Sequence, residues 1–109
     1  MGYTSDVMAQ RSSETSIEQL EALPGAELVS VGLRDLIAGD LTDEALLVLI
    51  GAPRLRRIGL DVPSRPDVDH PEHALYLRLD DAHGAAAHGK YNGLIRRLVS
   101  FERAAECLS

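Results

Sequence analysis

Residues 91–108 carry the strongest constraint on the fold, because their apolar side chains repeat with the period of a helix. Apolar residues recur three or four positions apart, at Tyr91, Leu94, Ile95, Leu98, Phe101, Ala105 and Leu108. This spacing places them on one face of an α-helix, and most of the charged residues between them lie off that face. The repeat predicts a long amphipathic helix of about 16–19 residues. Its apolar face must be covered by the rest of the chain or by another molecule.

The N-terminal half predicts several shorter helices. Residues 1–12 have no periodicity and predict a flexible N-terminal tail. A capping-box pattern at 15–18 predicts a short helix that ends at Pro24-Gly25. Residues 26–39 favour a helix, although their sub-run 28–33 also fits a short strand.

The next segment predicts two helices separated by a glycine. Thr42 caps the first helix, which runs to residue 50, and Gly51 closes it. Pro53 suits the first turn of a second, short helix over residues 54–58 that ends at Gly59.

Residues 61–71 contain three prolines and predict a loop. The segment 71–82 favours a helix, although the alternation of Leu75, Leu77 and Leu79 also fits a strand. A break is expected in the glycine-containing region 84–89. The chain therefore predicts an all-α fold, a small helical domain of four to six helices with a long C-terminal amphipathic helix. Residues 13–109 would form this single domain, with the loop 61–71 between an N-terminal helical unit and the C-terminal helices.

Charge is distributed unevenly along the 109 residues. The formal net charge is −6, yet residues 1–51 carry −7 and residues 52–109 carry +1. This balance argues against nucleic-acid binding over the whole surface and against a basic membrane-surface peptide. Cys107 is the only cysteine, so an intramolecular disulfide and a cysteine-rich zinc site are both excluded. The absence of a long apolar run predicts no membrane partner and a cytoplasmic location.

Two groups of cations are candidate binding residues. Lys90, Arg96, Arg97 and Arg103 form a local positive region on the last predicted helix, a candidate face for an anion or a partner. Arg54, Arg56 and Arg57 follow a glycine in a segment, 42–58, that is similar to a helix-turn-helix. The alternative interpretation of both groups is a solvated helix face whose arginines pair with carboxylates, and we favour it.

The histidines suggest a second alternative. Four residues separate Arg78 from His83, and an arginine followed by four to six residues and then a histidine resembles the HEPN ribonucleases, where the two residues meet at a dimer interface. The resemblance implies an all-α fold in which His83 acts as general acid or base and Arg78 holds a phosphate. Arg65 and His70 have a similar spacing. The four histidines are not spaced to share one metal ion, so we expect no metal and no cofactor.

The function that the sequence favours is a small, non-enzymatic protein-interaction or regulatory module. We expect it to self-associate as a homodimer, because one long and several short helices make a thin core at this size. It is also expected to contact another protein. The alternatives are a HEPN-like ribonuclease that uses Arg78 and His83, and a DNA-binding regulator that uses 42–58.

Overall fold

The structure is a computed structural model that describes residues 20–108, and all its regular elements are helical. The α-helices are α2 (Ala26–Ala38), α3 (Asp43–Ile58), α4 (Pro71–His83) and α5 (Ala87–Leu108), and a 3-10 helix, η2 (Gly84–Ala86), joins the last two. No strand occurs in residues 20–108. The predicted all-α class and the long C-terminal helix are therefore confirmed. The predicted tail and the capping box at 15–18 lie outside the described residues.

The chain enters α2 through turns. Residue 20 is in 3-10 conformation and residues 21–25 belong to turns and a bend, so the predicted first helix does not extend to Pro24 as an α-helix. Gly25, immediately before α2, has a φ of 79°, a left-handed conformation that glycine adopts without steric cost. The ambiguous segment 28–33 is helical, because Val29, Leu33 and Leu36 share one helix face and are buried together.

α3 is one continuous helix, and the two separate helices predicted over 42–50 and 54–58 are wrong. The predicted count of four to six helices is not matched as it was made, because it counted this segment as two helices. Thr42 does cap the helix: its hydroxyl accepts a hydrogen bond from the backbone N–H of Ala45 at 3.2 Å. Gly51 and Pro53 lie inside α3 rather than between two helices. A proline there costs about 3 kcal/mol. Buried side chains on both sides of it, from Leu46 to Ile58, offset that cost by holding the helix in the core.

Residues 60–70 connect α3 to α4 without a regular element, as the prolines indicated. The connection is anchored at its start, since the side chains of Leu60 and Val62 are buried. Arg56 reaches back from α3, and its Nε and Nη2 atoms donate to the carbonyl oxygen of Val62 at 3.2 and 2.9 Å. Helix α4 then begins at Pro71, whose fixed φ suits a first turn.

α4 and α5 form a helical hairpin. The chain breaks at Gly84, which has a φ of 55°, and α5 begins three residues later. The break expected in 84–89 thus occurs at Gly84–Ala86, whereas Gly89 lies inside α5, which reaches 22 residues. The ring of Tyr76 on α4 lies edge-on to that of Tyr91 on α5, with centroids 5.5 Å apart. Burial and the nearby carboxylate of Glu72 raise the pKa of Tyr91.

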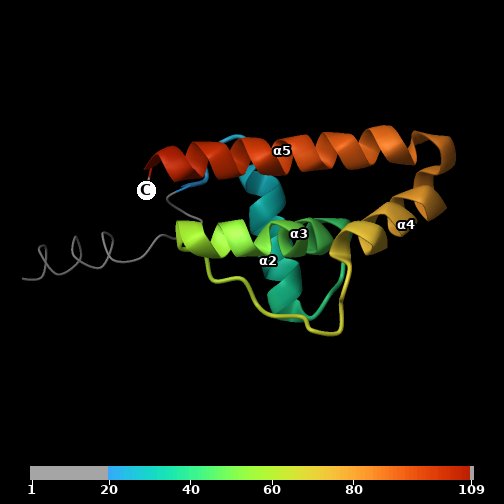
Figure 1. The fold of residues 1–109 in the computed structure, drawn as a ribbon, viewed down its shortest axis with the longest axis horizontal. Coiled ribbons are helices and arrows are strands. Elements are labelled where there is room, and N and C mark those ends of the chain that lie inside the picture. Colours follow the sequence, from blue (N-terminus) through green and yellow to red (C-terminus); the bar gives the residue numbers. More distant parts are fainter. Residues whose placement is uncertain (1–19, 109) are drawn as a thin grey trace, which may run out of the picture.

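α3 is the central helix, since it packs against α2, α4 and α5. Figure 1 shows α3 and α5 side by side and running in the same direction, with α4 opposite to them and α2 crossing. The start of α2 meets α5, where a side chain at Gly25 would collide with the backbone of Arg97. The fully buried side chains that fill the core include Phe101, Leu46, Leu47, Leu55, Leu75, Val29 and Val48. None of the helices described here is both long and apolar enough to cross a bilayer.

Candidate interaction groove

A groove of about 240 Å³ runs between α3 and α5, and we call it the α3–α5 groove. Its walls are mainly apolar, and its rim carries charged residues. The lining residues are Ile50, Gly51, Pro53, Arg54 and Arg57 from α3, and Ile95, Leu98, Val99 and Glu102 from α5. Ile50, Ile95 and Val99 are only partly buried, so the groove offers apolar surface to a partner.

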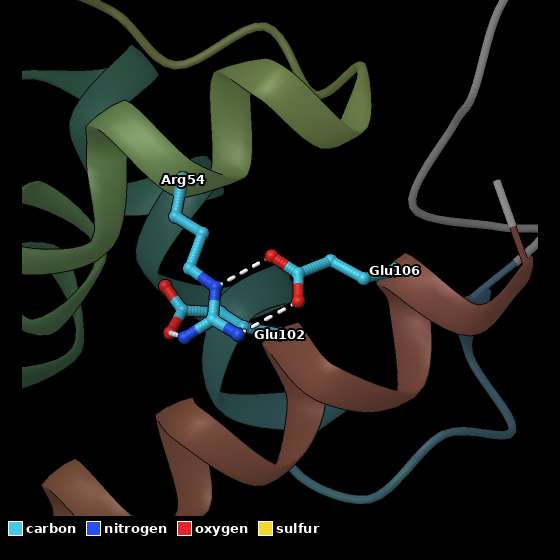
Figure 2. Close-up of polar contacts among 3 residues, drawn as sticks. All are labelled: Arg54, Glu102 and Glu106. Atoms are coloured by element: carbon cyan, nitrogen blue, oxygen red, sulfur yellow. Dashed lines mark hydrogen bonds and ion pairs between the residues drawn. The ribbon is translucent and has the colours of Figure 1, made fainter.

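Arg54 joins the two helices at one end of this groove (Figure 2). Its Nε and Nη2 atoms donate to the two carboxylate oxygens of Glu106 at 2.6 and 2.7 Å, which is a bidentate pair. Its Nη1 atom donates to Oε1 of Glu102 at 3.3 Å. These hydrogen bonds raise the pKa of Arg54 and, from the other side, lower the pKa of Glu106. The three residues fix the position of α5 relative to α3.

Glu102 is a carboxylate in an otherwise apolar position. It is only 3% exposed, whereas the other buried residues in 20–108 are hydrophobic or glycine. Burial raises the pKa of Glu102, and the positive charge of Arg54 opposes that shift without cancelling it. Glu106 adds a further, smaller upward contribution. Burial is thus the main cause of the raised pKa of Glu102.

Gly51 allows the two helices to approach at this point. A Cβ atom there would lie 2.8 Å from Oε2 of Glu102 and 3.0 Å from a methyl group of Leu98. A larger residue would have to displace the ends of these two side chains. The glycine that the sequence analysis interpreted as a helix stop is thus a contact point between two helices.

The arginines of the segment similar to a helix-turn-helix have different surroundings. The turn expected at Gly51 is wrong, because α3 is continuous there. Arg54 is held by two glutamates, and Arg56 donates to the loop carbonyl of Val62. Arg57 is exposed on the rim of the groove.

The four cations of α5 separate into two pairs. Lys90 and Arg97 are seven residues apart, and so are Arg96 and Arg103, which puts each pair on one side of the helix. Lys90 and Arg97 line a second pocket, described further below, whereas Arg96 and Arg103 are exposed and line neither pocket. Arg97 forms an ion pair with Glu27 at the start of α2.

Arg78 and His83 lie on different sides of α4. They lie five residues apart on α4, about 140° around the helix, and both are exposed. The Nε atom of Arg78 donates to Oδ1 of Asp43 on α3 at 2.8 Å. His83 lies at the end of α4, beside the second pocket.

Sequence reasoning missed Glu102 and the role of Gly51. A signal for Glu102 was present, since it lies four residues after Leu98 and seven after Ile95, both on the apolar stripe. A carboxylate at that position requires a cation from a facing helix, and Arg54 supplies it. No such signal existed for Gly51, because its neighbours belong to a helix more than forty residues away in sequence.

Within residues 20–108, no three His, Cys, Asp or Glu side chains gather so that they could hold a metal ion. No protein-family model, no curated protein and no solved structure matches this chain.

Proposed function

We propose that this protein is a non-enzymatic interaction module that self-associates as a homodimer through the α3–α5 groove and the α5 surface beside it. The observation that carries the proposal is the incomplete cover of the apolar stripe of α5. Leu98, Phe101 and Ala105 are buried in the core, whereas Tyr91, Leu94, Ile95 and Val99 keep part of their surface in solvent. A second copy would remove that surface from water.

The composition of the groove also favours a protein partner. Apolar side chains form its walls, and Arg57 and Arg54 stand at its edge. Interfaces between proteins combine an apolar centre with a polar rim and are enriched in arginine. In a two-fold dimer the same patch is used twice, so Ile95 and Val99 of one copy would contact the groove of the other.

The positions and partners of the candidate arginines give less support to DNA binding and to ribonuclease activity. A DNA-binding role would require Arg54 and Arg56 to leave the partners that they have inside the molecule. A ribonuclease of the HEPN type would require Arg78 and His83 to act on one phosphate, although they project from different sides of α4. We therefore keep self-association as the proposed function.

The experiment compares two lysine substitutions on adjacent residues of α5. Val99→Lys places an ammonium group in the groove, whereas Ser100→Lys adds the same charge at an exposed position outside it. Light scattering after size exclusion should give the mass of a dimer for the unmodified protein and for Ser100→Lys, and the mass of a monomer for Val99→Lys. Circular dichroism of all three proteins checks that the helices remain. A monomer for the unmodified protein at micromolar concentration would reject the proposal, as would a dimer for a well-folded Val99→Lys.

A further inference from the structure

The second pocket lies where three helices meet, and we call it the junction pocket. Its volume is about 340 Å³, within the range of small-molecule sites. It is lined by Asp43 from the start of α3, by Leu79 and His83 from α4, and by Lys90, Gly93, Leu94 and Arg97 from α5. It shares no residue with the α3–α5 groove.

Cationic side chains from one face of α5 converge on this pocket. Lys90 is the only lysine of the chain, and within the described residues it makes no ion pair or hydrogen bond. Arg97 pairs with Glu27, a carboxylate whose side chain is 63% exposed. Such an exposed pair contributes little and exchanges readily for another anion.

The carboxylate among the described lining residues, Asp43, has a cationic partner of its own. Asp43 accepts a hydrogen bond from Arg78 at 2.8 Å and forms an ion pair with it. His83 is also free of a hydrogen bond or ion pair in the described part of the chain, and its ring can donate to an anion. The lining of the pocket therefore carries a net positive charge, although the net charge of the whole protein is −6.

The remaining surface of the pocket is apolar and open. Leu79 is 2% exposed and Leu94 is partly buried, so they form a fixed floor. Gly93 lies between the cations on the same helix side, and a Cβ atom there would meet no other atom within 4 Å. The cationic groups thus lie next to space that an uncharged, apolar body can fill.

We propose that the junction pocket binds a small organic anion, whose phosphate or carboxylate group lies between Lys90 and Arg97. The apolar body of the ligand would cover Leu79, Leu94 and Gly93. Inorganic phosphate lacks that body and should bind less tightly, because only its charge would be recognised. The junction pocket shares Leu94 with the surface proposed for the dimer, but ligand binding and oligomeric state are measured separately, so either proposal can fail without the other.

The test is an NMR titration of the isotope-labelled protein with phenyl phosphate, which combines a dianion with an apolar ring. We expect saturable shifts of the amide signals of residues 79–97, with a dissociation constant below about 10 mM. Inorganic phosphate and benzyl alcohol, titrated separately, should each bind more weakly than phenyl phosphate.

Two matched substitutions locate the site. Lys90→Gln removes a cation of the pocket and should weaken phenyl phosphate binding about fivefold, the effect of one partly exposed ion pair. Arg96→Gln removes the same charge from the exposed outer side of α5 and should change binding less than about twofold. Equal weakening by both variants would show diffuse attraction and overturn the proposal. It would equally be overturned by unsaturable shifts, or by shifts confined to other helices.

Discussion

Glu102 shows how one charged residue is tolerated in the core. Its side chain is 5% exposed, and its partner Arg54 is 32% exposed, so the ion pair spans the boundary between the core and solvent. The guanidinium also holds Glu106 by two hydrogen bonds, which fixes its plane. Breaking such a pair by removing the cation leaves a buried, uncompensated carboxylate, and that state is costly. The position of Arg54 on α3 is thus tied to an acid on α5.

The raised pKa of Glu102 predicts a pH dependence of stability. Since the folded state holds the proton more tightly than the unfolded state, ionisation favours unfolding. Stability should therefore fall as the pH rises above the ordinary glutamate pKa of about 4.3, and level off once Glu102 is ionised in the folded protein. Glu102→Gln removes this titration and keeps the shape of the side chain.

The measurement is urea unfolding of both proteins from pH 4 to pH 8, at intervals of about half a unit. The free energy of unfolding of the unmodified protein, minus that of Glu102→Gln, should decrease with rising pH. All other groups titrate in both proteins and largely cancel in the difference. An increase of the difference with pH would mean that Arg54 outweighs burial, contrary to the prediction.

At the level of the helices, small residues decide how closely the elements pack. Gly32 on α2 faces α3, where a Cβ atom would collide with the backbone oxygen of Glu44 and with a methyl group of Val48. Gly51 plays the same part between α3 and α5. Backbone cannot move aside as a flexible side chain can, so the contact at Gly32 is the stricter of the two.

Gly32→Ala should therefore destabilise the protein, by about 2–3 kcal/mol, because α2 must move away from α3. The matched control is Gly93→Ala, also inside a helix, where an added Cβ meets no atom within 4 Å. That variant should gain about 0.5–1 kcal/mol from the higher helix propensity of alanine. Thermal unfolding of the two variants measures both effects, and a stabilised Gly32→Ala would contradict the packing described here.

The charge of the whole molecule bears on its association. The excess of acid belongs to residues 1–51, and the C-terminal half carries +1. The residues that line the proposed interface come mainly from the C-terminal half, so the excess acid of the N-terminal half lies largely outside it. Because residues 52–109 carry only +1, two copies that meet at α5 avoid the mutual repulsion that a charge of −6 spread evenly over the surface would cause.

Self-association of the folded chain predicts a melting temperature that depends on protein concentration. If the folded dimer unfolds to two separate chains, mass action raises Tm by about 3 °C for each tenfold increase in concentration. Val99→Lys, which should be monomeric, should melt at the same temperature at every concentration. A Tm of the unmodified protein that does not change over a hundredfold range would contradict the proposed dimer.

The helical elements followed from local pattern wherever one face of the segment was apolar at helical spacing. The stripe from Tyr91 to Leu108 predicted α5, and Thr42 predicted the start of α3, because spacing and capping act within one turn of the chain. The ambiguity at 28–33 and 74–80 had a physical basis: both segments also alternate as strands do. Their helical form is consistent with burial of Val29 and Leu33, and of Leu75 and Leu79, in one helical core.

The sequence by itself thus determined that this chain is helical, where α5 lies and which residues carry its charges. Only the tertiary structure decided that Gly51 and Pro53 lie inside one helix, since the burial of distant side chains outweighs their local preferences. It also decided which cations are already engaged: Arg54 is held by Glu102 and Glu106, whereas Lys90, at the junction pocket, makes no ion pair within residues 20–108. Both outcomes depend on contacts between residues far apart in the chain, which no local pattern records.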